Sequence, residues 1–215
     1  MVNYLNDTPD AVAEMLFRLG AIKVNLSQYH KLASGDYSPL YFDAKVLLSD
    51  VDARSMVSGR IVFWVHSQFE QVDAVVGVAD GGISWATTFG NCDMIPVLYA
   101  LKEPKNHGLM NQIEGELPKD GAKVVVIDDV ITTGDSALSV VNALREGKNG
   151  KKAEVLGVFS VIDWDMSAVN QRFEEEKVLK THMVTLDSVV KYGIEHNLLC
   201  EADREHILAF QQKHC

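Results

Sequence analysis

A single run, Val124 to Ser136, constrains this chain more than any other part of its sequence. It reads Val-Val-Val-Ile-Asp-Asp-Val-Ile-Thr-Thr-Gly-Asp-Ser. The β-formers up to Ile127 predict a buried parallel strand, because strands covered on both faces carry near-continuous apolar runs. Asp128 and Asp129 then stand at the carboxyl edge of the sheet, and a helical pattern of apolar residues follows the run. The sequence therefore predicts two carboxylates beside the amino end of a helix.

The turn between this strand and this helix, Thr132 to Ser136, has the composition of an anion-binding loop. Backbone N–H groups at a helix start favour an anion, and the hydroxyls of Thr133 and Ser136 add further donors. Such a loop beside two carboxylates suits a phosphorylated sugar, because the acids accept hydrogen bonds from vicinal hydroxyls while the loop surrounds the phosphate. The alternative is a strand with two solvated acids, followed by an ordinary helix cap.

The composition is that of a soluble globular protein. Of 215 residues, 47% are hydrophobic and 23% are charged, which is ordinary for a globular chain. The net charge of −10 argues against a nucleic-acid surface, which needs a basic face. Cys92, Cys200 and Cys215 fit no disulfide or metal-site spacing, so we expect reduced thiols in a cytoplasmic protein. We expect neither a secretory signal nor a membrane span.

Strand and helix patterns alternate from residue 74 onward. Strands are predicted over residues 74–78, 95–100, 123–127, 154–162 and 182–186, and helices from about residues 83, 135, 166 and 187. This alternation predicts a parallel, doubly wound sheet. Outside it we expect helices over residues 9–19, 50–69 and 201–212, and hairpin-like structure over residues 22–42.

A second candidate anion site follows the predicted strand 74–78. Ala79, Asp80, Gly81 and Gly82 come directly after it. Small residues and paired glycines let a backbone approach a ligand closely and form an anion-binding nest. Beside the first motif, this turn is interpreted as a pyrophosphate loop; a tight turn without a ligand is the alternative.

Residues 102–120, called the lid below, interrupt the alternation with a long aperiodic segment. Segments of this kind are often functional. Lys102, Lys105 and His107 can neutralise a departing anion and help to exclude water. The alternative is a solvated surface loop.

The run 124–136 resembles the phosphoribosyl pyrophosphate motif of the type I phosphoribosyltransferases nearly residue for residue. The lid and the segment Leu32 to Asp43 are similar to the orotate phosphoribosyltransferases, so that the resemblance spans roughly residues 32–186. It implies a type I phosphoribosyltransferase fold: a central parallel sheet flanked by helices, in a single domain over residues 1–215. A small hood would come mainly from residues 1–50, with a flexible lid over residues 102–120.

The same resemblance implies transfer of ribose 5-phosphate from phosphoribosyl pyrophosphate to orotate, with Mg²⁺ held mainly by the substrate diphosphate rather than by protein ligands. It assigns catalytic roles to Lys102, Lys105, His107, Asp128 and Asp129. It assigns substrate binding to Ala79, Asp80, Gly81, Gly82, Val130, Ile131, Thr132, Thr133, Gly134, Asp135, Ser136, Tyr41, Phe42 and Trp164. A homodimer whose lid reaches the neighbouring subunit's site is expected, without nucleic acid or membrane as partner.

Two positions depart from the family pattern. Leu101 and Trp164 stand where the family usually has arginine, the second near the orotate carboxylate. Tryptophan cannot replace a bidentate Arg–carboxylate contact. Another pyrimidine or purine, on which Trp164 would stack, is therefore an alternative acceptor. A regulator that binds phosphoribosyl pyrophosphate without catalysis is a second alternative, which the retained basic lid disfavours.

Overall fold

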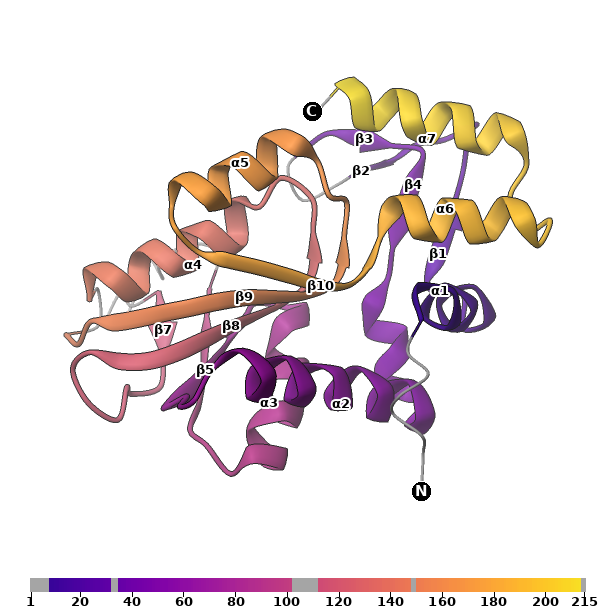
Figure 1. The fold of residues 1–215 in the computed structure, drawn as a ribbon. Helices are drawn as coiled ribbons and strands as arrows, with labels where there is room; N and C mark the ends of the chain where they lie inside the picture. The colour runs from indigo at the N-terminus through magenta and orange to yellow at the C-terminus, as the bar shows by residue number, and fades with distance from the viewer. Residues whose placement is uncertain (1–7, 32–34, 102–111, 148–149, 214–215) are drawn as a thin grey trace.

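The protein is built around a six-stranded sheet in the order β10-β9-β8-β5-β6-β7 (Figure 1). The structure is a computed structural model, and it describes residues 8–31, 35–101, 112–147 and 150–213. The strands are β5 (Ala74–Val78), β6 (Val97–Ala100), β7 (Ile113–Glu114), β8 (Ala122–Ile131), β9 (Ala153–Asp163) and β10 (Leu179–Thr185). Neighbouring strands are parallel except β7, which is antiparallel to β6. The predicted parallel sheet is confirmed, with a short antiparallel strand at one edge that the sequence did not predict.

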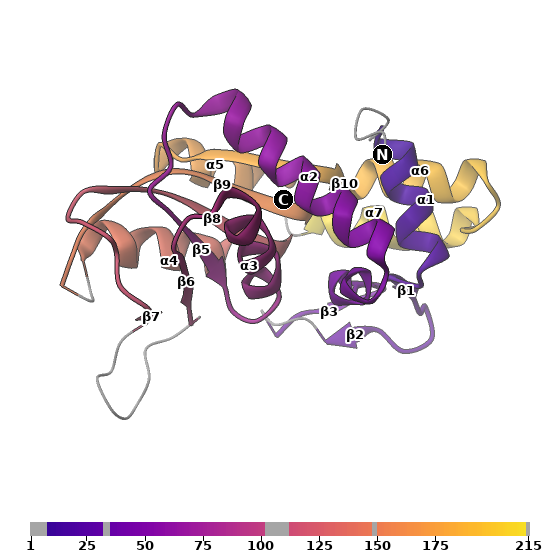
Figure 2. The same cartoon turned by 90° about the horizontal axis from the view of Figure 1, so that it is seen from below.

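Helices cover both faces of this sheet. α4 (Asp135–Glu146) and α5 (Ser167–Glu175) lie on one face, and α2 (Val51–Gln68) and α3 (Gly81–Asp93) lie on the other (Figures 1 and 2). Because helices cover both faces of the sheet, its central strands are apolar along most of their length. Every residue of β5 is buried, and β8 is buried from Val124 to Asp128. None of the helices in the described ranges is long and apolar enough to cross a membrane.

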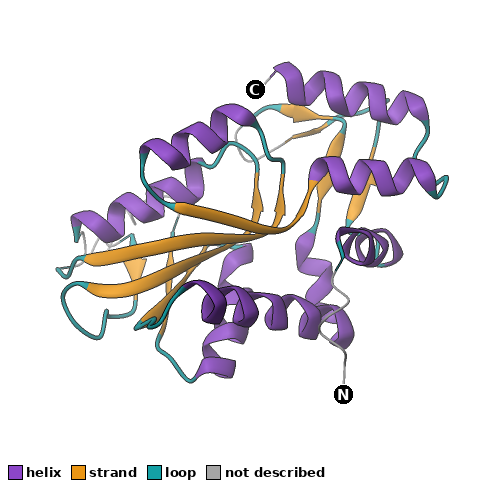
Figure 3. Ribbon diagram, viewed as in Figure 1, coloured by secondary structure: helices purple, strands orange, loops and turns teal. Residues whose placement is uncertain are grey.

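The amino-terminal part forms two small sheets beside the carboxyl-terminal helices. Its elements are α1 (Pro9–Arg18), β1 (Ile22–Val24), β2 (His30–Lys31), β3 (Tyr37–Ser38), β4 (Leu40–Phe42) and the 3-10 helix η2 (Ala44–Ser49), and the terminal helices are α6 (Leu186–Glu195) and α7 (Glu201–Lys213). β1 pairs with β4 and β2 with β3, all antiparallel, which confirms the predicted hairpin-like structure. Figure 3 shows these strands grouped with α7 at one end of the molecule. Phe17 of α1 stacks on Tyr192 of α6 with ring centroids 6.2 Å apart.

β8 is longer than the sequence predicted. The prediction ended the strand at Ile127, whereas pairing with β9 continues to Ile131, opposite Asp163. The β-branched residues after the acid pair keep the backbone extended. Asp128 and Asp129 therefore lie within the strand and not after it, which decides where their side chains point.

A buried carboxylate ends β9 and is neutralised by β10. Asp163 is 0% exposed and forms an ion pair with Lys180, and His182 Nδ1 lies 3.6 Å from Asp163 Oδ2. The backbone N–H of Asp165 donates to Asp163 Oδ1 at 2.8 Å. Burial by itself would raise the pKa of Asp163, but the nearby side chains of His182 and Lys180 and the N–H of Asp165 outweigh it and lower the pKa.

We expect Asp163→Asn to lower the free energy of unfolding by about 3 kcal/mol at neutral pH, because a buried Lys180 ammonium loses its counter-charge. A carboxyl whose pKa is lowered by folding stabilises the protein above its unfolded pKa of about 3.9. That stabilisation is lost as the pH falls through the folded pKa. Urea unfolding from neutral to acidic pH should therefore show the wild type and the variant converging in acid. Asp165→Asn, which removes the exposed second carboxylate 3.9 Å from Lys180 Nζ, is the control for loss of a nearby surface charge. A difference between Asp163→Asn and the wild type that does not shrink in acid would contradict the expectation.

Candidate active site

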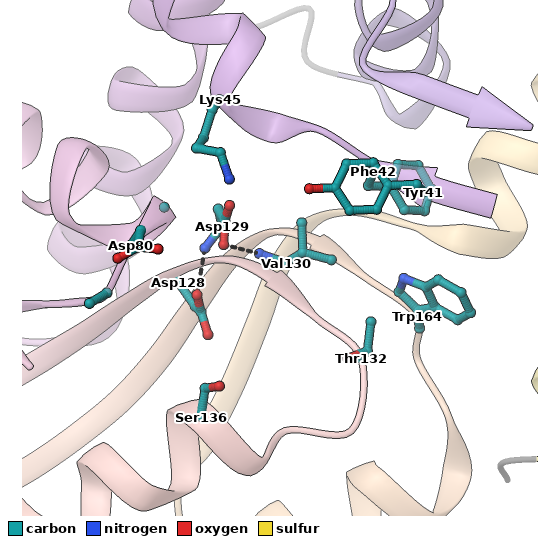
Figure 4. Close-up of a pocket in the computed structure, with 12 residues that line it drawn as sticks. Tyr41, Phe42, Lys45, Asp80, Asp128, Asp129, Val130, Thr132, Ser136 and Trp164 are labelled. Atoms are coloured by element: carbon teal, nitrogen blue, oxygen red, sulfur yellow. Dashed lines mark hydrogen bonds between the residues drawn. The ribbon is translucent and has the colours of Figure 1, made fainter. Parts of the chain in front are cut away.

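The carboxyl ends of β5 and β8 meet at one edge of the sheet, where a cavity of about 170 Å³ opens. Ligands of open α/β sheets bind in this position. The lining residues, drawn in Figure 4, are Tyr41, Phe42, Lys45, Ala79, Asp80, Gly81, Asp128, Asp129, Val130, Thr132, Ser136 and Trp164. Every predicted substrate-binding segment thus contributes to one cavity.

Asp128 and Asp129 point to opposite sides of the end of β8. Successive side chains of a strand alternate between its faces, and Figure 4 shows Asp128 directed toward Ser136 and Asp129 toward Lys45. Local backbone bonds orient both acids: Asp128 Oδ1 accepts from the N–H of Asp129 at 2.9 Å, and Asp129 Oδ1 accepts from the N–H of Val130 at 3.0 Å. The pair therefore supplies fixed hydrogen-bond acceptors on the cavity wall.

The turn after β5 lies directly against Asp129. A Cβ atom at Gly81 would be 1.9 Å from Asp129 Oδ2, and one at Gly82 would be 2.1 Å from the carbonyl oxygen of Ile127. Only glycine permits this approach. The peptide bond Ala79–Asp80 is cis. Because α3 begins at Gly81, the amino end of a helix lies at the cavity.

The loop between β8 and α4 brings a second helix start to the cavity. Thr132 and Ser136 line it, and Gly134 has a φ of 76° just before α4 begins at Asp135. The hydroxyl of Thr133, predicted to bind an anion, donates instead to Asp135 Oδ2 at 2.7 Å. The predicted binding residues that do not line the cavity are Gly82, Ile131, Thr133, Gly134 and Asp135.

Known proteins share this sequence pattern. Residues 48–163 match the family described as phosphoribosyl transferase domain. The orotate phosphoribosyltransferase of Lactococcus lactis is 30% identical over 203 residues, 94% of this chain and 94% of the relative. The orotate phosphoribosyltransferase of Phocaeicola vulgatus is 38% identical over 185 residues, 84% and 85% of the two chains. The chain belongs to the orotate phosphoribosyltransferase family.

The fold agrees with solved phosphoribosyltransferase structures. The orotate phosphoribosyltransferase of Aeropyrum pernix matches with a TM-score of 0.70 at 31% identity, over 84% of this chain and 96% of that one. UMP synthase of Leishmania donovani, at 22% identity, shares the fold with a TM-score of 0.78, over 96% of this chain and 42% of that one. The predicted type I phosphoribosyltransferase fold is confirmed.

Aromatic side chains form the end of the cavity opposite Asp80 (Figure 4). Trp164 follows β9, and its backbone N–H donates to the carbonyl of Ile131 at 2.9 Å. Its indole is 1% exposed and meets the rings of Phe42 and Phe210 at 81° and 69°. This burial leaves little ring face on which a base could stack. The indole Nε1 has no hydrogen-bond partner within the described part of the chain.

Lys45 is a cavity residue that the sequence analysis missed. It lies in η2, shortly after Phe42, and Figure 4 shows its ammonium directed toward Asp129. Among the described lining residues it is the only basic one, beside three aspartates. A cation there offsets part of the carboxylate charge. The signal was a basic residue three positions after Phe42 of the aromatic pair Tyr41-Phe42.

The predicted catalytic residues Lys102, Lys105 and His107 lie outside the described residues. The residues on either side of this segment are hydrogen-bonded to each other. The N–H of Leu101 donates to the carbonyl of Gln112 at 2.8 Å, and β6 pairs with β7. Since β6 runs parallel to β5 beside it, the lid leaves the sheet at the edge that carries the cavity.

The described side chains offer little to a metal ion by themselves. In the ranges that the structure covers, no group of three or more His, Cys, Asp or Glu side chains is arranged to hold one. The lining aspartates have the oxygen ligands that Mg²⁺ prefers. A magnesium ion here would need most of its ligands from a substrate, which fits a diphosphate.

Proposed function

We propose that the protein transfers ribose 5-phosphate from phosphoribosyl pyrophosphate to orotate, giving orotidine 5′-monophosphate and pyrophosphate. The observation that carries the proposal is the single cavity in which two fixed carboxylates lie between two helix starts. Phosphoribosyl pyrophosphate has anionic groups at both ends and hydroxyls between them, so its donors and charges complement this wall. The orotate relatives named above support orotate as the acceptor.

Each part of the cavity has a place in this reaction. Asp128 and Asp129 would accept hydrogen bonds from the ribose hydroxyls, residues 132–136 would hold the 5′-phosphate, and residues 79–82 the diphosphate. A ring nitrogen of the base attacks C1 from the face opposite the diphosphate and releases its proton, which the departing pyrophosphate can take up. The new C–N bond forms as the C1–O bond breaks, and that electron pair leaves with pyrophosphate. The sugar ring gains positive charge in the transition state, which the oriented carboxylates stabilise.

The lid would serve the leaving group. Lys102, Lys105 and His107 carry the positive charge and donors to stabilise pyrophosphate and to exclude water that would hydrolyse the activated sugar. Bound Mg²⁺ would supply further neutralisation of the diphosphate. The flanks at Leu101 and Gln112, beside the carboxyl end of β5, support this position.

The base would lie between Tyr41-Phe42, Thr132 and Trp164. We propose that Trp164 contacts it in the ring plane, through the Nε1–H donor, and not by stacking. The buried ring and the missing partner of Nε1 support this contact, because a buried donor without an acceptor is costly. An oxygen of the base, such as one of the orotate carboxylate, would supply the acceptor.

We expect Trp164→Phe to raise the KM for orotate about tenfold, with kcat changed less than about twofold, since the Nε1–H donor is lost while an aromatic ring remains beside Phe42 and Phe210. Trp85→Phe is the matched control, because Trp85 is also fully buried with an Nε1 that lacks a partner among the described residues. Trp85 lies in the core and not in the cavity. Equal KM changes in the two variants would contradict the proposed contact.

We also propose a homodimer in which each lid reaches the neighbouring subunit's site. Exposed apolar side chains on α2 and after α3 support an interface there: Phe63 is 60% and Met94 87% exposed. Phe63 also lines a groove of about 520 Å³ between the two helices. Apolar patches of this kind often mark contacts between proteins. Sedimentation equilibrium should give twice the chain mass of 23.8 kDa; a monomer would contradict it.

We also propose the domain organisation and the location that the family resemblance implies. Residues 1–215 would form one domain, in which a hood of residues 1–50 supplies Tyr41 and Phe42. The lid would be limited to the part of 102–120 that precedes β7, because Ile113 and Leu117 are buried in the body of the fold. A cytoplasmic location fits the free cysteines Cys92 and Cys200.

The acceptor is tested with a panel of bases. Orotate, uracil, adenine and hypoxanthine are each incubated with phosphoribosyl pyrophosphate, Mg²⁺ and the protein, and products are identified by mass. We expect orotidine 5′-monophosphate as the main product. Because Trp164 replaces the expected arginine, transfer to another base is the second candidate, and the panel would show it directly. Binding of phosphoribosyl pyrophosphate without any product would instead indicate a regulator.

A further inference from the structure

Helix α5 contacts the proposed 5′-phosphate loop, residues 132–136, on the side away from the cavity. Arg172 of α5 donates from Nη1 to the carbonyl of Thr133 at 2.7 Å, and Nη1 lies 2.8 Å from Asp135 Oδ1. Thr133 Oγ1 donates to the other oxygen of Asp135 at 2.7 Å. The guanidinium, the hydroxyl and the carboxylate thus form one closed network across residues far apart in the sequence.

The same helix packs against the centre of the loop. A Cβ atom at Gly134 would lie 3.0 Å from the ring of Phe173 and 3.1 Å from Val169 Cγ1. Both residues are buried on α5. The left-handed backbone at Gly134 is therefore held in place by apolar contact on one side, while Arg172 fixes the polar groups beside it.

This network offsets the negative charge of Asp135, which would otherwise repel a phosphate bound in the loop. A phosphate dianion bound by residues 132–136 would be repelled by a nearby carboxylate, and Asp135 is the first residue of α4. Thr132 and Ser136 line the cavity, whereas Thr133 and Asp135 do not. The carboxylate is thus turned toward α5, where the guanidinium balances its charge. Burial would raise the pKa of Asp135, but the bonds from Thr133 and Arg172 outweigh it and lower the pKa, so the group remains ionised.

We propose that Arg172 is a positioning residue for phosphoribosyl pyrophosphate. It neutralises Asp135 and holds the Thr133 carbonyl, so that the amino end of α4 and the Ser136 hydroxyl remain available to the 5′-phosphate. Arg172 acts through the loop and does not touch the substrate. This inference rests on the proposed use of the loop for the 5′-phosphate.

The effect of Arg172 should appear in ligand binding more than in stability. The side chains of Arg172 and Asp135 are 43% and 65% exposed, and exposed ion pairs contribute little to folding. Thermal unfolding of an Arg172 variant should therefore stay close to that of the wild type. A loss of affinity for the dianion would then not be explained by general loss of structure.

The test uses Arg172→Met, which keeps the aliphatic part of the side chain and removes the donors and the charge. Calorimetric titration with phosphoribosyl pyrophosphate and Mg²⁺, without a base, should show a Kd raised about tenfold. In turnover assays the KM for phosphoribosyl pyrophosphate should rise similarly, while kcat and the KM for orotate change less than about twofold. Adding Asp135→Asn to Arg172→Met removes the unpaired carboxylate and should return the Kd to within about threefold of the wild-type value.

Arg145→Met is the matched control. Arg145 of α4 also bridges to the segment after α5, donating from Nη1 to the carbonyl of Glu176 at 2.8 Å, at the end of α4 away from the loop. Its loss should leave the Kd unchanged. A wild-type Kd in Arg172→Met, a double variant no better than Arg172→Met, or an equal effect of Arg145→Met would each overturn the inference.

The binding measurement also separates this inference from the proposed acceptor. Wild-type protein that binds phosphoribosyl pyrophosphate but transfers nothing to orotate would refute the acceptor, while the comparison of Kd values would still decide the role of Arg172. Wild-type protein that does not bind phosphoribosyl pyrophosphate would overturn both.

Discussion

Asp129→Asn is expected to lower kcat/KM for transfer to orotate by about a hundredfold, the loss that follows removal of one preorganised charged group at a reacting centre. The carboxylate is proposed to hold a ribose hydroxyl and to face the positive charge that develops on the sugar. Asparagine keeps an oxygen for the N–H of Val130, which now donates to Asp129 Oδ1 at 3.0 Å. The fold should therefore survive, and the loss should reflect charge and donor geometry alone.

Asp120→Asn is the matched control for this variant. Asp120 precedes the opposite end of β8, and its Oδ1 accepts from the backbone N–H of Lys152 at 2.8 Å. Both substitutions thus replace an aspartate that accepts a backbone hydrogen bond, but only one of the two lines the cavity. Steady-state kinetics that give similar values for the two variants would contradict the role of Asp129.

Gly81→Ala is expected to reduce activity about as much as Asp129→Asn, although it removes no functional group. The three atoms nearest to a Cβ at Gly81 all belong to the Asp129 carboxylate, the closest at 1.9 Å. This side chain can turn aside, so we expect a folded protein whose carboxylate is misplaced. Displacement of a positioned group by about 1 Å can cost about a hundredfold in rate.

Two comparisons make this expectation specific. Because Gly81→Ala and Asp129→Asn are both expected to act through the Asp129 carboxylate, the kcat/KM of the double variant should be at most about threefold below that of either single variant. Gly82→Ala should instead lower the unfolding temperature, since its Cβ would meet the carbonyl oxygen of Ile127 at 2.1 Å, and backbone cannot turn aside. Multiplicative losses in the double variant would show that Gly81 does not act through Asp129.

The sequence predicted the elements whose pattern is local. The strand over residues 74–78 is found as β5 with the same bounds, and the helix expected over residues 9–19 is found as α1 (Pro9–Arg18). The acid pair also lies at the carboxyl edge as predicted. In each case residues next to one another in the sequence determine the structure.

The features that the sequence did not predict depend on distant partners. Ile113–Glu114 is a strand because it pairs with Tyr99 and Ala100, and nothing in two residues alone signals that pairing. β8 runs on to Ile131 because β9 offers it a partner. Arg172 reaches Thr133 from another helix, and no spacing rule connects them. Of the candidate site, the sequence therefore predicted the acid pair and the turns after β5 and β8, and missed Lys45 and Arg172, whose positions depend on tertiary packing.

A crystal structure of the protein with phosphoribosyl pyrophosphate and Mg²⁺ tests the central claim most directly, because that claim concerns where each part of one substrate lies. The account predicts the ribose hydroxyls within about 3 Å of the carboxylate oxygens of Asp128 and Asp129. It further predicts the 5′-phosphate at the start of α4 and the diphosphate at the turn 79–82. A sugar bound away from the acid pair, or a 5′-phosphate bound at Gly81, would contradict it.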